Sequence, residues 1–526
     1  MKKCPECRRV YTDESFDYCL DDGSRLIASG TESDAVTEVF DNIPMPNPAV
    51  NSAGRPSSET EGQPAFTNSI AVLPFTNMSA DADNEYFCDG LAEELLNALS
   101  KIEVLRVAAR TSAFSFKGKN TDIRDVGNRL NVANVLEGSV RKSGDRLRIT
   151  AQLINVSNGF HVWSEKYDRQ MKDIFDIQDE ISLAIVDALK VKLIGKEKAR
   201  VIKHYTESTE AYQLYLKGRF YANKWTAEGI RKGIEYFNKA VEIDPDFALA
   251  YSGMADCYSS LSSESTGSSP HVSAPKARAA TLKALELDDT LAEAHTSLAL
   301  VHMNYEWDWL AAEKELKRAL ELDPKYVPAL HWYSHWLVLM GRIDESENVS
   351  KRALEIDPLD HEINAHLAWH FYSSRQFELS EEQALRTVEI APNFHEAYWF
   401  LGWVYEHKKL YDKAIEEFKK AVSYSGGSPR MLGELGKAYG LSGRKTDAVK
   451  IADELLELSS RQYVSPYNLA LVYLGLRDNE RTIEWLKKSC DDRSALLPYL
   501  NTQWQFDEIR SDARFAEIVE RIGLPA

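Results

Sequence analysis

Cysteine is scarce in this chain of 526 residues. There are six cysteines, and three of them fall within the first nineteen positions. A disulfide framework needs many cysteines in a short chain, so this distribution argues against a secreted, disulfide-stabilised protein. Long apolar runs are also missing: none approaches the roughly 20 residues that span a bilayer, and the first residues lack the apolar core of a secretory signal. We expect a cytoplasmic protein without a membrane span.

Basic residues are fewer than acidic residues in this chain. The chain has 81 acidic and 63 basic residues, and its formal net charge is −18. Such a surface repels the phosphate backbone of a nucleic acid, so we do not expect nucleic acid as the main partner. Apolar residues make up 44% of the chain, as in ordinary globular proteins, and the length indicates two to four domains.

The familiar catalytic motifs are absent too. The stretches "LEGSV" and "FKGKN" do not complete the phosphate-binding pattern G-x-x-x-x-G-K-[ST]. The sequence contains no G-x-S-x-G nucleophile elbow, no H-E-x-x-H helix and no set of kinase signatures. These absences favour a non-enzymatic protein.

What is present begins with a small cysteine motif, "MKKCPECRRVYTDESFDYCLDDGSRL". A C-x-x-C pair offers two thiolates to one metal ion, and a second pair would complete the tetrahedron that zinc prefers. Here aspartate stands where the fourth cysteine would be. The frame resembles the bacterial zinc-ribbon leader, which implies a zinc-ribbon-like module over residues 1–28. The expected ligands of one structural zinc ion are Cys4, Cys7, Cys19 and Asp22.

Two alternatives remain for this module. Asp21 or water could fill the fourth position in place of Asp22. The module could also be a ribbon that has lost zinc and persists as a disordered leader. Residues 29–66, which follow, are rich in serine, proline, glycine, asparagine and acids. Such a segment buries too little apolar surface to offset its chain entropy, so we expect a disordered linker.

From residue 67 the sequence shows the apolar patterns of regular strands and helices. "SIAVLPF" is typical of a buried strand and "NEYFCDGLAEELLNALSKI" of an amphipathic helix. A second strand and a second helix follow, then three strands separated by the turn signals "SGD" and "SNG", then a closing helix. The order β-α-β-α-β-β-β-α predicts a mixed sheet with helices packed on it over residues 67–195.

Several of these runs carry a resemblance. "SIAVLPFTNMS", "EYFCDGLAEEL", "VLEGSVRKSGDRLRITAQLI" and "HVWSEKYDR" resemble the TolB amino-terminal-like domain. That α/β domain occurs in bacterial signalling proteins, usually just before tetratricopeptide repeats. The resemblance implies a role in signalling or regulation but assigns no ligand.

The remainder of the chain repeats itself. "ALELDP", "ALEIDP" and "TVEIAP" end at Pro324, Pro358 and Pro392, which are 34 residues apart. This spacing is the tetratricopeptide period. Residues 208–526 are therefore predicted to form about eight repeats of paired helices plus a capping helix. One pair is too small to bury both its faces, so the pairs stack into an all-α solenoid with a concave groove.

The middle repeats are unusually aromatic: "HWYSHW", "HLAWHFY" and "YWFLGWVY". In tetratricopeptide families the corresponding positions of the first helix face the groove. The residues expected to line it for a partner are His331, His335, Trp369, Trp399 and Trp403. Packing between repeats is the alternative for the tryptophans. His331 and His335, spaced i,i+4, could bind a metal, but no third ligand is evident from the sequence.

These features lead to a three-part interaction protein of bacterial signalling or regulation. The primary hypothesis is a non-enzymatic scaffold that binds a partner peptide or protein through the concave groove. The alternative is a regulatory or sensor subunit whose α/β domain binds a small ligand and signals to the repeats. Three isolated cysteines are expected to be buried thiols: Cys88, Cys257 and Cys490. The sequence does not indicate an oligomeric state.

Overall fold

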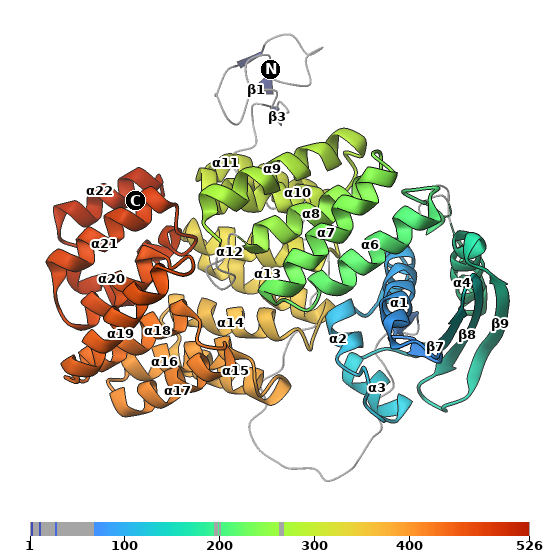
Figure 1. Ribbon diagram of the computed structural model, residues 1–526, viewed down its shortest axis with the longest axis horizontal. Helices are drawn as coiled ribbons and strands as arrows, with labels where there is room; N and C mark the ends of the chain where they lie inside the picture. The colour runs from blue at the N-terminus through green and yellow to red at the C-terminus, as the bar shows by residue number, and fades with distance from the viewer. Residues whose placement is uncertain are drawn as a thin grey trace. The chain divides into compact units, whose positions relative to one another are not determined.

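The computed structural model describes residues 68–193, 198, 201–261 and 268–524, together with the backbone of three short strands nearer the amino terminus (Figure 1). The chain divides into two compact units, Met1–Gly62 and Gln63–Ala526. The second unit therefore contains both the α/β region and the repeats.

The three short strands form a small antiparallel sheet in the first unit. The central strand β1 (Lys2–Lys3) pairs with β2 (Val10–Tyr11) and with β3 (Ile27–Ala28). The predicted zinc ligands Cys4, Cys7, Cys19 and Asp22 lie outside the described residues, as does the predicted linker over residues 29–66. Both remain predictions.

The predicted mixed sheet is confirmed in the second unit. Its strand order is β6-β4-β7-β8-β9, with β5 pairing to β7 off this path. Strand β4 runs parallel to β6 and β7, and β7, β8 and β9 form an antiparallel meander. The bounds are β4 (Ser69–Val72), β5 (Thr76–Asn77), β6 (Arg106–Val107), β7 (Asn134–Ser143), β8 (Arg146–Asn155) and β9 (His161–Gln170).

Helices cover both faces of this sheet, which explains why β4 is buried along its whole length. Its Ile70 and Val72 belong to one hydrophobic cluster with residues of α1 (Glu85–Ser100) and α4 (Ile174–Ala188). Ala71, which points the other way, joins a second cluster with α3 (Ile123–Leu130). The short helix α2 (Arg110–Phe114) follows β6.

The repeats form eight consecutive helix pairs within the described residues. In chain order they are α6 (Thr209–Ala222) with α7 (Ala227–Ile243), α8 (Ala248–Leu261) with α9 (Pro270–Leu287), α10 (Ala292–Val301) with α11 (Trp309–Leu322), α12 (Val327–Leu339) with α13 (Ile343–Ile356), α14 (His361–Ser373) with α15 (Phe377–Ile390), α16 (His395–His407) with α17 (Tyr411–Tyr424), α18 (Pro429–Leu441) with α19 (Lys445–Ser459), and α20 (Pro466–Gly475) with α21 (Asn479–Asp492).

The last 30 or so residues complete the array. Two short 3-10 helices, η4 (Leu497–Asn501) and η5 (Trp504–Ile509), precede α22 (Ala513–Ile522). Within this unit the end of the array meets its third repeat, because the indole Nε1 of Trp309 donates to the Ile522 carbonyl at 3.1 Å.

Small residues allow the two helices of a pair to approach closely. A Cβ atom added at Gly402 would lie 2.5 Å from the ring of Phe418, which is closer than side chains pack. Glycine is therefore required where α16 crosses α17. The cysteines expected to be buried are buried: Cys88, Cys257 and Cys490. Among the described helices, none is both long and apolar enough to span a bilayer.

Candidate functional site

The aromatic residues expected to line an open groove are buried. Trp369, Trp399 and Trp403 are 5%, 2% and 3% exposed, and His331 and His335 are 6% and 5% exposed. Their burial does not support an exposed binding surface at these five residues, and their role in binding a partner stays a prediction. The burial of the three tryptophans agrees with the alternative of packing inside the array.

Residues that follow the last repeat pack against two of these side chains, Trp369 and His335. The ring of Tyr499 in η4 lies 5.1 Å from that of Trp369, and its hydroxyl lies 3.3 Å from Nδ1 of His335. The indole of Trp504 in η5 donates to the Tyr372 carbonyl at 3.0 Å. Burying this large apolar area is favourable. The aromatic run "PYLNTQWQF" in this segment is the sequence signal that could have indicated these contacts.

A buried ion network lies beneath the tryptophans. The Lys437 ammonium, 1% exposed, contacts Glu406 at 2.9 Å and Glu434 at 2.6 Å. The indole of Trp399 donates to Glu434 at 3.0 Å. Burial acts to lower the pKa of Lys437, but the two carboxylates outweigh it and the pKa is raised. The interior of the array is thus held by charge pairing as well as by apolar packing.

Three histidines meet between the fourth and fifth repeats. His331 and His335 of α12 each place Nε2 near Nδ1 of His366 in α14, at 3.2 and 3.0 Å. The other ring nitrogen of His366 lies 3.0 Å from a Glu396 carboxylate oxygen. His366 is the third imidazole that the sequence analysis missed. It follows His331 by 35 residues, one more than the repeat period, so alignment on the period alone does not place it beside the pair.

Burial and charge act differently on these imidazoles. Burial lowers the pKa of His331 and His335 well below the usual range, and the neighbouring imidazoles lower it further. Burial also acts to lower the pKa of His366, but the Glu396 carboxylate outweighs it and the pKa is raised. The cluster therefore combines two imidazoles whose pKa is lowered with one whose pKa is raised by a carboxylate.

A buried carboxylate joins the α/β region to the first repeat. Glu93 of α1 is 4% exposed and accepts from Arg110 at 2.8 Å and from Arg219 of α6 at 2.5 Å. Burial alone would raise the pKa of Glu93, but the two guanidinium groups lower it to about 2. Removing one partner of such a buried group leaves uncompensated charge, so this junction is energetically sensitive.

A second junction ties the α/β region to the fourth and fifth repeats. The backbone N–H of Ser112 donates to Asp357 at 2.9 Å, and the Leu359 N–H donates to the Ser112 hydroxyl at 2.8 Å. The Lys325 ammonium donates to the Glu103 carbonyl at 3.0 Å. Two separate sets of polar contacts therefore fix the α/β region against the repeats.

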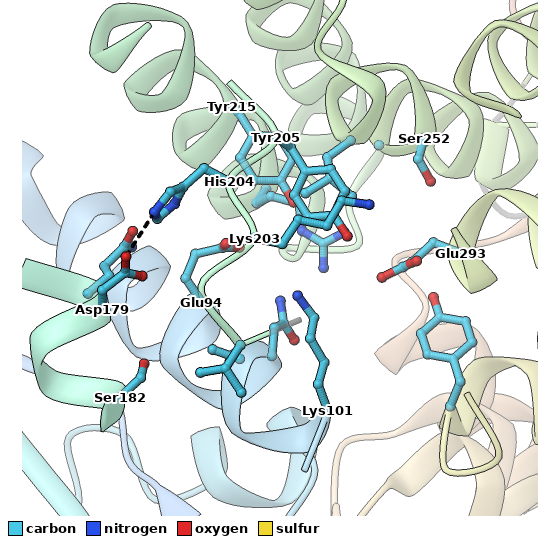
Figure 2. Close-up of a pocket in the computed structure, with 18 residues that line it drawn as sticks. Glu94, Lys101, Asp179, Ser182, Lys203, His204, Tyr205, Tyr215, Ser252 and Glu293 are labelled. Carbon is cyan, nitrogen blue, oxygen red and sulfur yellow. Dashed lines mark hydrogen bonds and ion pairs between the residues drawn. The ribbon is translucent and has the colours of Figure 1, made fainter. Parts of the chain in front are cut away.

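Between these junctions lies a polar cavity of about 130 Å³ (Figure 2). Its walls come from α1 and α4 of the α/β region, from residues 201–205 and from the first helices of the first three repeats. The side chains of Glu94, Lys101 and Glu293 extend into this space. Two other wall residues are paired with each other, since His204 lies 3.2 Å from Asp179.

The charged groups of this cavity are not fully compensated. Within the described residues, the Glu94 carboxylate has neither a hydrogen bond nor an ion pair. Burial, assisted by the nearby Glu93, raises the pKa of Glu94 to about 7. Burial lowers the pKa of Lys101 although Glu94 and Glu293 act against it. Partly buried charged groups of both signs around one sheltered space are typical of a site for a small charged molecule.

Comparison with protein families identifies two segments. Residues 66–184 match the second domain of HilA/YgeH-like transcriptional regulators. Residues 366–429 match the tetratricopeptide repeat, which confirms the repeat prediction. The TolB amino-terminal-like resemblance was not tested by these matches and stays a prediction. Tetratricopeptide arrays are in general scaffolds for protein interaction.

One curated relative shares substantial identity. The chain is 42% identical over 205 residues to a protein of Rhizobium meliloti (strain 1021) named "Putative adenylate cyclase 3". The match covers 39% of this chain and 34% of that protein, so the chain spans about a third of the relative's length.

Solved structures show a more distant likeness. Yeast Tom70 is 16% identical, with 66% of this chain and 82% of that chain covered and a TM-score of 0.40. PilF of Pseudomonas aeruginosa is 19% identical, with 40% and 91% covered and a TM-score of 0.32.

Proposed function

We propose that the protein is a non-enzymatic regulatory protein that binds a small charged molecule between its α/β region and its first repeats. The repeats then present an outer surface to a protein partner. The observation that carries this proposal is the shared cavity, because a ligand there would touch both parts at once. Its occupancy would therefore alter how firmly the two parts are held together.

The comparisons support a regulatory role. The α/β segment is similar to a domain of transcriptional regulators, and part of the chain is similar to the protein named "Putative adenylate cyclase 3". The matched family and the relative carry names of different activities, which is consistent with the matched regions serving regulation in both. The sequence contains no phosphate-binding loop, nucleophile elbow, H-E-x-x-H helix or set of kinase signatures. The aromatic residues expected to bind a partner are buried, which weakens the primary scaffold hypothesis. Their burial favours the alternative of a sensor that binds a small ligand.

The size and charge of the cavity restrict the ligand. A cavity of about 150 Å³ holds one benzene-sized molecule, and this one is about 130 Å³. A nucleotide is too large for it. Carboxyl groups on Glu94 and Glu293 and the ammonium of Lys101 suit a small molecule that carries both charges, such as an amino acid.

A panel of the common amino acids and small carboxylates should contain at least one compound that raises the thermal midpoint of the full chain. Lys101→Met should remove that shift, because it deletes the cation that faces the carboxyl group of the ligand. Lys119→Met serves as the matched control, since Lys119 is exposed and outside the cavity. Retention of the shift in Lys101→Met would contradict the proposed site.

The leader is proposed to bind one zinc ion through Cys4, Cys7, Cys19 and Asp22. Cys4→Ser with Cys7→Ser should remove about one equivalent of zinc from the purified chain, as measured by metal analysis. Asp22→Cys should tighten binding, because thiolate is the more usual ligand in structural sites. Equal zinc content in the parent and the double variant would contradict a leader site.

A further inference from the structure

We infer that His331, His335 and His366 form a binding site for a divalent transition-metal ion, of which zinc is the natural probe. One nitrogen of each ring takes part, and the three nitrogens lie within 4.8 Å of one another. The site joins α12 to α14, which belong to consecutive repeats. It is independent of the proposed ligand cavity and of the cysteine leader.

The spacing of the nitrogens fits coordination to one ion. Zinc binds histidine nitrogen at about 2.0–2.1 Å with tetrahedral angles, which places two such nitrogens about 3.3 Å apart. Nδ1 of His366 lies 3.2 Å from Nε2 of His331 and 3.0 Å from Nε2 of His335. Both distances are within a few tenths of an ångström of the value for two nitrogens on one zinc ion.

The groups around the three rings orient them for a metal. Glu396 faces Nε2 of His366 at 3.0 Å, so this nitrogen donates its proton and Nδ1 is left as the bare nitrogen that faces the other rings. The Tyr499 hydroxyl lies at Nδ1 of His335 and directs the Nε2 of that ring inward. Carboxylate and hydroxyl partners of this kind are typical of metal-binding histidines.

The remaining tetrahedral position falls to water or to the Glu362 carboxylate. A carboxylate oxygen of Glu362 lies 3.9 Å from Nε2 of His331, and its side chain is 45% exposed. A turn about its side-chain torsions would bring it to the ion, and its exposure offers a path from solvent. Imidazole ligands suit zinc, copper, iron and nickel, whereas magnesium and calcium prefer oxygen.

A proton is the competing explanation for the same contacts. A His366 ring with protons on both nitrogens would donate to Glu396 and share its other proton between His331 and His335. That arrangement needs no metal. Metal binding would release this proton, so the two explanations predict different results on titration with zinc.

The test uses the full chain with Cys4→Ser and Cys7→Ser, so that the leader contributes no site. After treatment with a chelator, calorimetric titration should reveal about one zinc equivalent and a higher thermal midpoint. Cobalt should bind without the thiolate charge-transfer absorbance of a cysteine site. His366→Ala should weaken zinc binding at least about a hundredfold, and Glu396→Gln about 10–100-fold.

His361→Ala is the matched control, because His361 lies on the same helix and packs on Phe394 away from the cluster. It should bind zinc as the parent does. If His366→Ala does not fold, His331→Gln replaces it, since that change leaves the pair of His366 with Glu396 intact. Absence of zinc binding by the folded parent would overturn the inference. Undiminished zinc binding by folded His366→Ala, or by folded His331→Gln, would overturn it as well.

Discussion

Trp399→Ala is expected to lower the free energy of unfolding by about 3–5 kcal/mol, the usual cost of emptying a buried aromatic site. The Trp399 side chain is 2% exposed and stacks on Phe400 at 4.7 Å. Its indole also donates to Glu434, which would lose that partner. The thermal midpoint should fall by about 3–5 °C, because the unfolding entropy of so long a chain is large. Scanning calorimetry of the full chain measures the change.

Trp225→Ala is the matched control. Trp225 is 68% exposed, so its replacement should change stability by less than about 0.5 kcal/mol. A normal midpoint in Trp399→Ala would contradict the closed interior of the array. That result would restore the hypothesis of an open aromatic groove.

Glu93→Gln is expected to destabilise the junction between the α/β region and the first repeat by about 3–5 kcal/mol. The change keeps the shape of the side chain but removes the negative charge that Arg110 and Arg219 share, and an unpaired buried charge carries a cost of this size. Hydrogen exchange should accelerate in α1 and α6 before the rest of the chain. Glu228→Gln, in an exposed pair with Lys232, should leave the stability nearly unchanged, because solvent screens such a pair.

The same residue gives the junction a defined pH dependence. The folded pKa of Glu93 is lowered to about 2, below its unfolded value of 4.5. The contribution of Glu93 to the free energy of unfolding is therefore complete above pH 4.5 and is lost as the pH falls toward 2. The stability difference between the parent and Glu93→Gln should shrink over this range. A constant difference would show that the carboxylate is not ionised in the folded protein.

The sequence predicted the elements whose signals are local. The strand runs and turn signals of residues 134–170 match β7, β8 and β9, and the 34-residue period matches the helix pairs. Both signals arise from neighbouring residues, because a strand alternates its faces and each repeat packs on the next.

The sites depend on contacts between distant segments, which no local pattern records. Tyr499 covers Trp369 across 130 residues, and Glu93 meets Arg219 across 126. The cavity draws its walls from α1, α4 and three repeats, so its composition became visible only with the fold. The sequence indicated two of the three histidines of the cluster, because His331 and His335 are one helical turn apart. His366 belongs to the next repeat, so no local pattern joined it to them.

Hydrogen exchange of the full chain, with and without the panel compound that most raises the midpoint, tests the central claim most directly. A ligand in the shared cavity should slow exchange in α1 of the α/β region and in α8 and α10 of the repeats together. Slowing confined to one of the two parts, or no slowing with any compound of the panel, would contradict a site built from both.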